Sequence, residues 1–398
     1  MSKTVFKKGL IFLIAVLFLL GCARPAQEPA SDEAAAPAPF AADYALVWEI
    51  LENDYPYLDY LRDKGIRVDS IRERYAERVN NVKQAKSFSE ILNQMFGELE
   101  FTAHLFVINP EFFREFYTIY VLSPDVKESL FFQPWREILI KAAESERYSV
   151  PKNAENGEPV QPKDRPKVKV TYFEDCKTLC LKIPTFLFDT VERDRDLLQT
   201  SLEQYPETEN IIFDLTGNSG GSTEYWYENL VAPFGEDHTF RWRNFYKDTP
   251  ENNRIVENMF DLCNTSEAAD APEWAIRYGL NRYICVEQFV QGREAVHSDA
   301  KRWVLVNSDV YSSSEEFVVF CKLTGWATVV GAQTWGDGMG FSPVLRYLPD
   351  SGLLFEFDMT AGENPDGTMN IEGTTPDIVL DTVDVDHLLE LIRQEQTD

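Results

Sequence analysis

The spacing of hydrophobic positions changes along the chain from a helical period to a strand-like one. Between residues 44 and 98, apolar residues recur three and four positions apart, which predicts two to four short helices. The positions are Leu46, Ile50 and Leu51, and then Ile91, Leu92, Met95 and Phe96. Ser87 and Glu90, three residues apart, have the form of a capping box and predict that a helix starts there. This first part is therefore expected to be helical.

Beyond residue 165 the chain alternates between short β-rich runs and helical patterns. The β-rich runs are residues 167–173, 178–183, 211–215, 303–307 and 328–331, and the helical patterns are residues 189–204, 224–231 and 315–323. Strands that alternate with helices predict an α/β core with a largely parallel central sheet. Gly325 follows the last helical pattern and is a plausible C-cap. Between the two parts, residues 135–143 have a helical pattern and residues 152–163 indicate an exposed loop.

The N-terminus has the form of an export signal. Lys3, Lys7 and Lys8 precede an apolar run at residues 10–20, which ends on Leu-Leu-Gly before Cys22. This run is shorter than the roughly 20 apolar residues of a membrane-spanning helix. The order of features is typical of a bacterial lipoprotein signal peptide over residues 1–21, with lipid attached to Cys22. The alternative is a retained N-terminal anchor with an ordinary cysteine.

The sequence divides into further segments after the signal. Residues 22–42 are rich in Ala, Pro and acidic side chains and predict a flexible tether. We expect a helical N-terminal subdomain with an insert over residues 43–165 and a catalytic core over residues 166–398. The acylated Cys22 would anchor the protein in the lipid bilayer of the cell envelope. The membrane would be the outer face of the cytoplasmic membrane or the outer membrane.

Charge and cysteine content narrow the possible partners. The formal net charge is −28, and loss of the three signal lysines would make it −31. A protein with so large a negative charge repels nucleic acid and anionic lipid headgroups. The five cysteines after Cys22 form no Cys/His grouping at zinc spacing, so we expect neither metal nor other cofactor. Cys176 and Cys180 could form a disulfide across a tight turn, although two buried thiols are the simpler interpretation.

Two strand-to-helix turns carry residues suited to hydrolytic chemistry. Residues 215–222, rich in glycine, follow one predicted strand and could hold an anion or oxyanion, or form a plain turn. Ser312, Ser313, Ser314 and Glu315 follow another predicted strand and open a helix. A serine at a helix N-terminus lies beside free N–H groups that can stabilise an oxyanion. Ser312 and Glu315 also have capping-box spacing, and on this pattern alone helix capping is the favoured interpretation.

Together, these turns resemble the motifs of the tail-specific (C-terminal processing) and tricorn-core serine peptidases. The resemblance continues in Val-Val-Gly-Ala-Gln-Thr-Trp-Gly at residues 329–336 and in Ile-Glu-Gly-Thr-Thr-Pro-Asp-Ile at residues 371–378. It also includes Leu-Glu-Phe-Thr-Ala-His at residues 99–104. It implies a crotonase/ClpP-like α/β core with a central β-sheet, preceded by a small helical N-terminal subdomain. The glycine-rich loop of a PDZ module is not found between these motifs.

The resemblance also assigns roles to individual residues. Ser314, directly before the glutamate, matches the nucleophile. The N–H groups of Gly220 or Gly221 and of Glu315 would form the oxyanion hole. The lysine base of the tail-specific branch is replaced by Asp337, whose carboxylate is a poor base for a serine hydroxyl. The tricorn-like branch instead implies His104 as the base, and Glu372 as the residue that orients it.

The expected function is therefore that of an exported, membrane-tethered serine endopeptidase. It would hydrolyse a peptide or protein substrate through an acyl-enzyme, with a Ser-His rather than a Ser-Lys arrangement. One alternative is a catalytically inactive binding or scaffold lipoprotein with the peptidase fold. Another is an esterase or amidase that acts on a small substrate with the same residues. Oligomeric state and cleavage preference are not predicted.

Overall fold

The computed structural model describes residues 38–124, 126, 128–148, 150, 165–257, 263–264, 270–293, 296–297 and 299–397. Every element described below belongs to one compact unit, Ala38–Asp398. The predicted signal peptide, Cys22, most of the tether and the loop at residues 152–163 lie outside the described residues. Among the described residues, no helix is both long enough and apolar enough to cross a membrane.

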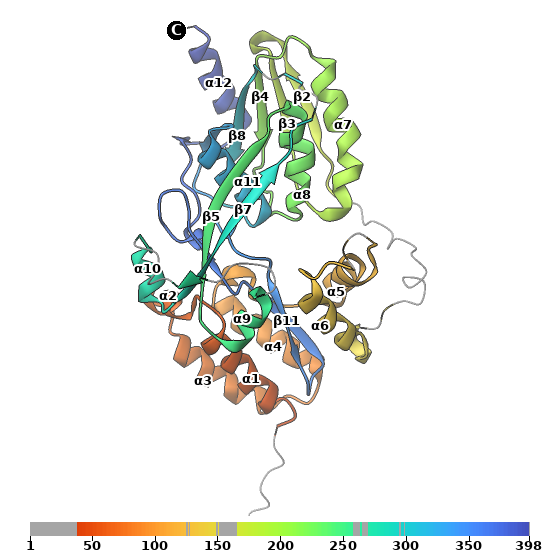
Figure 1. The fold of residues 1–398 in the computed structure, drawn as a ribbon, viewed down its shortest axis with the longest axis vertical. Coiled ribbons are helices and arrows are strands. Elements are labelled where there is room, and N and C mark those ends of the chain that lie inside the picture. Colours follow the sequence, from red (N-terminus) through yellow and green to blue (C-terminus); the bar gives the residue numbers. More distant parts are fainter. Residues whose placement is uncertain are drawn as a thin grey trace, which may run out of the picture. The chain divides into compact units, whose positions relative to one another are not determined.

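The chain begins with four successive α-helices and then combines strands with helices (Figure 1). The helices are α1 (Ala41–Asn53), α2 (Leu58–Asp63), α3 (Val68–Val79), α4 (Ala85–Glu98), the 3-10 helix η1 (Thr102–His104), α5 (Pro110–Tyr117), α6 (Gln133–Ala143), α7 (Val191–Gln204), α8 (Thr223–Trp226), α9 (Pro250–Val256), α10 (Glu273–Arg277), α11 (Ser313–Thr324) and α12 (Val385–Glu395). The strands are β1 (Phe106–Val107), β2 (Lys169–Phe173), β3 (Thr178–Lys182), β4 (Asn210–Asp214), β5 (His238–Tyr246), β6 (Cys263–Asn264), β7 (Arg282–Val290), β8 (Lys301–Val306), β9 (Thr328–Gly331), β10 (Val344–Leu348), β11 (Leu353–Phe357), β12 (Ala361–Gly362) and β13 (Ile378–Val379).

The largest sheet has six strands in the order β13-β9-β8-β4-β3-β2. Every neighbouring pair is parallel except β2 with β3, which confirms the predicted α/β core. Its central strand β4 is buried at all five positions, as expected for a sheet covered on both faces. Because β4 and β8 are parallel neighbours, their carboxyl ends lie at the same edge, and the two candidate turns follow from that edge.

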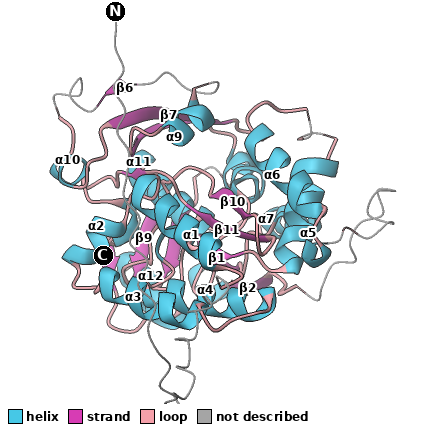
Figure 2. Ribbon diagram, turned by 90° about the horizontal axis from the view of Figure 1, so that it is seen from below, coloured by secondary structure: helices cyan, strands magenta, loops and turns pink. Residues whose placement is uncertain are grey.

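Two smaller antiparallel sheets were not predicted. One joins β1, β11 and β10, and the other joins β12, β5, β7 and β6. In the first, Phe106 lies opposite Glu356 and Val107 opposite Phe355. Side chains alternate between the faces of a strand, so the odd-numbered residues of β11 share one face and Glu356 points to the other. Figure 2 shows these short strands (magenta) among the helices (cyan).

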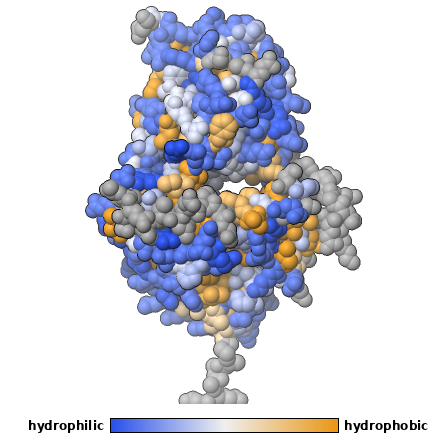
Figure 3. Space-filling model, in the orientation of Figure 1, coloured by the Kyte–Doolittle hydropathy of each residue, from blue (hydrophilic) through white to orange (hydrophobic). Residues whose placement is uncertain are grey.

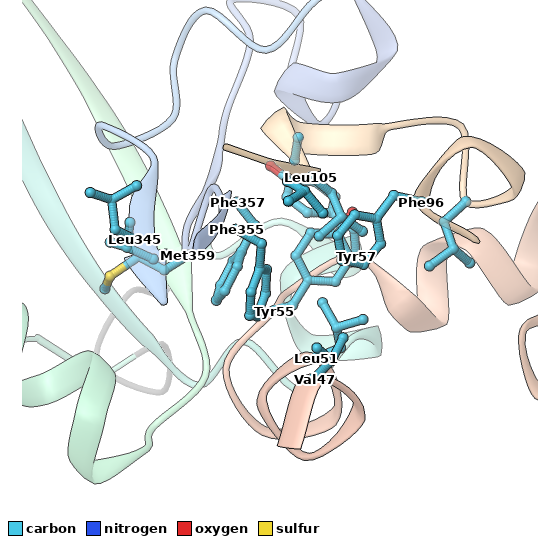
Figure 4. Close-up of a cluster of buried hydrophobic side chains, with 14 of the residues drawn as sticks. Val47, Leu51, Tyr55, Tyr57, Phe96, Leu105, Leu345, Phe355, Phe357 and Met359 are labelled. Atoms are coloured by element: carbon cyan, nitrogen blue, oxygen red, sulfur yellow. The ribbon is translucent and has the colours of Figure 1, made fainter. Parts of the chain in front are cut away.

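A large hydrophobic core surrounds the odd-numbered face of β11. Phe355 and Phe357 are fully buried, and Tyr55 packs edge-on against Phe357 with ring centroids 5.7 Å apart. Figure 4 shows that side chains from α1, α4, the residues after η1 and β11 converge here. The labelled members are Val47, Leu51, Tyr55, Tyr57, Phe96, Leu105, Leu345, Phe355, Phe357 and Met359. The core therefore joins the helical first part of the chain to segments from its last quarter.

Most predicted elements are confirmed, and one boundary is wrong. Four helices, α1 to α4, occupy the region for which two to four were expected. Helix α4 begins at Ala85, so Ser87 lies inside the helix and does not cap it. Gly325 ends α11 in the left-handed conformation, with φ 67°, as predicted. Cys176 and Cys180 are buried free thiols, which agrees with the simpler of the two interpretations.

The molecular surface is predominantly polar on the face drawn in Figure 3. Apolar residues on that face gather near α5 and α6, where Phe112 and Ile140 are 39% and 48% exposed. Scattered exposed apolar side chains are normal on soluble proteins. The acidic composition and this polar surface are consistent with each other.

Candidate active site

His104 lies in a tight, strained turn between α4 and β1. Glu100, Phe101, Ala103 and His104 all have positive φ angles, between 51° and 62°. Residues other than glycine rarely adopt this left-handed conformation, and such strain gathers at functional sites. The segment after β11 stabilises this turn. Ala103 is fully buried, and its carbonyl accepts a hydrogen bond of 2.8 Å from the N–H of Asp358.

The imidazole of His104 connects a serine with two carboxylates. Its Nε2 lies 3.1 Å from Ser312 Oγ. Its Nδ1 lies 2.9 Å from Asp337 Oδ2 and 3.3 Å from Asp358 Oδ2. Both aspartates are buried, and His104 itself is partly exposed. The arrangement places a nucleophile on one ring nitrogen and charged orienting groups on the other.

Ser312 occupies the N-cap position of α11 in an unusual backbone conformation. Its φ and ψ are 59° and −129°, and its side chain makes no capping hydrogen bond. The capping interpretation of this serine is therefore wrong, because its hydroxyl faces His104 instead. The backbone N–H of Ser312 donates to the Gly336 carbonyl at 3.1 Å, which fixes the strained turn. Ser312 is half-buried, and an accessible hydroxyl on a strained strand-to-helix turn is suited to nucleophilic attack.

Ser314 does not lie where the sequence prediction placed it. It is fully buried in the first turn of α11. Its Oγ is 2.7 Å from the Asn218 carbonyl and 2.8 Å from the Tyr311 carbonyl, and it accepts from the Tyr311 N–H at 3.2 Å. These contacts tie the glycine-rich turn to the start of α11. The serine that the structure brings to His104 is Ser312, two residues earlier.

Glu372 also does not occupy its predicted place. Its side chain is exposed, and its backbone carbonyl accepts a hydrogen bond from Gln333 Nε2 at 2.7 Å. The carboxylates beside the His104 Nδ1 are Asp337 and Asp358. Asn370, the residue directly before the motif at residues 371–378, donates from its Nδ2 to Asp337 Oδ1 at 3.0 Å. The aspartate that replaces the family lysine is therefore built into the site as a partner of the histidine.

The two aspartates differ in their charge state. Burial opposes the ionisation of Asp337, but the neighbouring His104 outweighs it and lowers the pKa of Asp337 below its ordinary value. Burial and the charge of Asp337 raise the pKa of Asp358 well above its ordinary value. Burial opposes the charging of His104, while Asp358 and Asp337 together raise the His104 pKa well above its ordinary value. Asp337 is thus the charged partner of the imidazole.

Tyr311 completes the hydrogen-bond network around the histidine. Its hydroxyl donates to Asp337 Oδ2 at 2.6 Å and accepts from the His104 backbone N–H at 3.1 Å. Its ring lies 4.8 Å from the imidazole and 5.7 Å from the ring of Trp335, which is 56% exposed. Sequence reasoning missed Tyr311 because an aromatic residue next to a serine-rich turn carries no signal of such a role.

The glycine-rich turn packs directly against the serine turn. A Cβ atom at Gly220, where φ is 94°, would lie 2.6 Å from the Tyr311 carbonyl oxygen and 2.9 Å from Ser312 Cβ. A Cβ atom at Gly221 would lie 2.4 Å from the backbone of Phe186, which pairs with Gly221 as an isolated parallel bridge. Only glycine fits this close approach of backbones. The two turns therefore form one surface beside Ser312.

The donors predicted for the oxyanion hole differ in their availability. The Gly220 N–H donates to Asn218 Oδ1 at 2.9 Å and is already satisfied. Within the described part of the chain, the N–H groups of Gly221 and Ser313 have no hydrogen-bond acceptor. The Glu315 carboxyl is buried and accepts from Thr374 Oγ1 at 2.6 Å, and burial raises its pKa to about 7. Its side chain anchors the helix start.

Three residues of the site could also hold a metal ion. Donor atoms of His104, Asp337 and Asp358 all lie within 4.8 Å of one another. Asp358 was missed by the sequence analysis, because it follows β11 in a segment with no family motif. The period-2 pattern of residues 355–359, in which Glu356 and Asp358 alternate with the buried Phe355, Phe357 and Met359, is a signal from which it could have been found.

Comparison with known proteins identifies two matching family models. Residues 177–380 match the model of peptidase family S41, and residues 36–97 match the tricorn protease C1 domain. The first match contains the glycine-rich turn, Ser312, Asp337 and Asp358, and His104 lies between the two matched segments. A comparison with curated protein sequences found no match.

Several solved structures are similar over most of the chain. A protein from Parabacteroides merdae has a TM-score of 0.53 at 17% identity, covering 89% of this chain and 93% of its own. A lipoprotein from Streptococcus agalactiae has a TM-score of 0.50 at 12% identity, covering 92% and 99%. Mature CPAF has a TM-score of 0.50 at 13% identity, covering 89% and 96%. Similarity at this level of identity concerns the fold.

Proposed function

Because the chain belongs to peptidase family S41 and is a serine-type peptidase, we propose that Ser312 is its nucleophile and His104 its general base. The observation that carries this proposal is the 3.1 Å contact between Ser312 Oγ and His104 Nε2. A candidate base must lie within hydrogen-bond reach of the proton that it abstracts. Ser314 fails this condition, since its hydroxyl is buried against two backbone carbonyls.

In the proposed first step, the Ser312 hydroxyl attacks the carbonyl carbon of a peptide bond. Its proton passes to His104 Nε2, and the Nδ1–H of the same ring is held by Asp337 at 2.9 Å. The charged Asp337 stabilises the imidazolium that forms and fixes the ring tautomer. The imidazolium then protonates the leaving amine, which gives an acyl-enzyme that water hydrolyses through the same groups in reverse.

The proposed oxyanion hole uses backbone N–H groups beside Ser312. The proposed donors are the N–H groups of Gly221 and Ser313. Gly221 is one of the two glycines predicted, and the N–H of the other, Gly220, is already bonded to Asn218. Ser313 takes the place predicted for Glu315, because the proposed nucleophile is Ser312 and not Ser314. Ser313 follows the nucleophile directly at the first position of α11, where the helix dipole adds positive potential. Donors of this kind stabilise the negative charge that develops in the tetrahedral intermediate.

A pair of serine variants tests the assignment of the nucleophile. Full-length protein in detergent is treated with a fluorophosphonate probe, which reacts with an activated serine. We expect Ser312→Ala to abolish labelling and Ser314→Ala to retain it. Loss of labelling in Ser314→Ala, with labelling kept in Ser312→Ala, would return the role to Ser314. Labelling of neither the wild type nor the variants would favour the inactive scaffold protein.

The proposal extends to an exported, lipid-anchored endopeptidase. The signal-like N-terminus with Cys22 supports the anchoring, and the family supports a peptide or protein substrate. Metabolic labelling with an alkyne fatty acid should mark the wild-type protein and not Cys22→Ala. Cleavage of peptides blocked at both ends would establish endopeptidase action. Cleavage of ester substrates alone would support the esterase alternative.

A further inference from the structure

We propose that the donor atoms around His104 Nδ1 form a zinc site, and that zinc bound there reversibly inhibits the enzyme. The donors are His104 Nδ1, Asp337 Oδ2 and Asp358 Oδ2, with the Tyr311 hydroxyl at the fourth position. The inhibitory effect rests on the serine mechanism proposed above, while the binding of zinc does not. Spacing along the chain gives no sign of the site, because its members come from widely separated segments.

The distances between the donors approach those of a tetrahedral zinc site. With bonds of about 2.0–2.2 Å to nitrogen and oxygen, neighbouring ligand atoms of a tetrahedral zinc lie about 3.3 Å apart. Nδ1 of His104 lies 2.9 Å from Asp337 Oδ2, 3.3 Å from Asp358 Oδ2 and 3.3 Å from the Tyr311 hydroxyl. The Tyr311 hydroxyl lies closer than this to Asp337 Oδ2, at 2.6 Å. To admit the ion, Asp337 Oδ2 would move away from His104 Nδ1 by about 0.4 Å and from the Tyr311 hydroxyl by about 0.7 Å, a shift that a change of side-chain torsion can supply.

The cluster has one basic group, His104, for two buried carboxylates. Asp337 and Asp358 are 3% and 1% exposed, and no lysine or arginine in the described segments forms an ion pair with either. Asp358 Oδ1 is buried and has no hydrogen-bond partner among the described residues. Buried carboxylates require a proton, a cation or a metal ion as compensation. A divalent cation would supply that compensation and give Asp358 Oδ1 a role as a second oxygen ligand.

Zinc at this position would disable the base by changing its tautomer. A neutral imidazole that binds metal through Nδ1 carries its proton on Nε2. Nε2 would then donate towards Ser312 Oγ, which lies 3.1 Å away, and could not accept the serine proton. The metal would also take Asp337 away from its role in orienting the ring. Inhibition should therefore be complete at saturation and reversible by a chelator.

The test measures zinc binding independently of activity. Full-length protein in detergent is freed of metal with EDTA, dialysed against ZnSO₄, and analysed for bound zinc. We expect one zinc per chain, loss of fluorophosphonate labelling at saturation, and recovery with EDTA. Cobalt(II) in place of zinc should give the strong visible absorption of a tetrahedral site. Absence of stoichiometric binding, or the weak spectrum of an octahedral complex, would overturn the proposal.

Matched variants locate the ion. Asp358→Asn and Asp337→Asn should each weaken zinc binding by about tenfold or more, and Tyr311→Phe should weaken it less. The control is Asp384→Asn, which removes the carboxylate of the exposed pair His387–Asp384, whose contact is 2.7 Å. Zinc lost from the control and kept in the other variants would overturn the proposal. If no form of the protein labels, the serine mechanism fails, and zinc stoichiometry still decides this inference.

Discussion

The two walls of the site are built in different ways. The wall with the nucleophile consists of Gly221 and Ser312, each on a turn that leads from the carboxyl end of a parallel strand. The opposite wall consists of His104 and Asp358, which lie side by side where β1 and β11 meet in an antiparallel pair. The first wall depends on local turns of one sheet. The second depends on joining segments about 250 residues apart, so it should be more sensitive to changes in the core.

The two walls each contribute one of the carboxylates that lie beside His104 Nδ1. Asp337 comes from the loop after β9 and belongs to the nucleophile wall through Tyr311, to which it is hydrogen-bonded. Asp358 comes from the end of β11 and belongs to the histidine wall. Their different pKa directions give them different tasks, since Asp337 is charged and Asp358 tends to keep its proton.

The largest expected effect is on kcat, and it should differ between variants of the two aspartates. Asp337→Asn should lower kcat by about 10⁴-fold, because an uncharged amide neither fixes the productive tautomer nor stabilises the imidazolium. Asp358→Asn should cost less, since Asp358 is the more distant and the less charged partner. Steady-state kinetics in EDTA measure both. An equal loss in the two variants would contradict the division of roles between the walls.

The next largest effect is on the free energy of unfolding, and it comes from the core packing next to His104 and Asp358. Phe357→Ala should lower the free energy of unfolding by about 3–5 kcal/mol, because it leaves a cavity beneath the strand that ends at Asp358. Activity per folded molecule should also fall, as the His104–Asp358 contact loosens. Denaturant titration and active-site labelling measure the two effects. Val379→Ala, at a 67% exposed position, is the control and should change stability by less than about 0.5 kcal/mol.

A third effect is a pH dependence of stability from the nucleophile wall. Burial raises the pKa of Glu316 to about 7 from an ordinary value of 4.5. Between these values the folded state holds a proton that the unfolded state has lost, so stability falls as the pH rises and is level above about 7. The slope is on the order of 1 kcal/mol per pH unit.

Unfolding midpoints at pH 5, 6 and 7 check this expectation. Glu316→Gln should make the decline less steep, since its side chain cannot ionise, and Glu224→Gln on the exposed surface of α8 should leave it unchanged. A decline of the same steepness in Glu316→Gln would assign the effect to other groups. Glu315, whose pKa is also raised to about 7 by burial, is the first of these.

The smallest effect concerns Ser314. Ser314→Ala should destabilise the protein by about 1–3 kcal/mol, because it removes the hydroxyl that joins the Asn218 and Tyr311 backbones. Its kcat should stay within about tenfold of the wild type, the range expected for a group that does not take part in the reaction. Thermal unfolding and kinetics on the same preparation measure both. A loss as large as that of Ser312→Ala would mean that the serine assignment is wrong.

Much of the fold could be predicted from the sequence, because helices and strands leave a hydrophobic pattern in neighbouring residues. The alternation of β-rich and helical runs predicted the parallel sheet, and Gly325 marked the end of α11. The antiparallel strands β5, β7, β10 and β11 were missed. Their pairing depends on which distant segments meet, and the pattern within one strand does not specify its partner. The start of α4 was misplaced at Ser87, because a capping-box pattern can also fall inside a helix whose burial continues towards the N-terminus.

By itself, the sequence determined the residue types of the site and its location at the carboxyl ends of the parallel strands, because motifs and hydrophobic period are properties of neighbouring residues. It indicated His104, which the structure places 3.1 Å from Ser312 Oγ, and it left three adjacent serines that no spacing rule could separate. Only the tertiary structure decided that Ser312 faces the histidine, that Ser314 is buried, and that Asp337 and Asp358 replace Glu372 beside the ring. Those choices depend on backbone angles and on contacts between segments far apart in the chain.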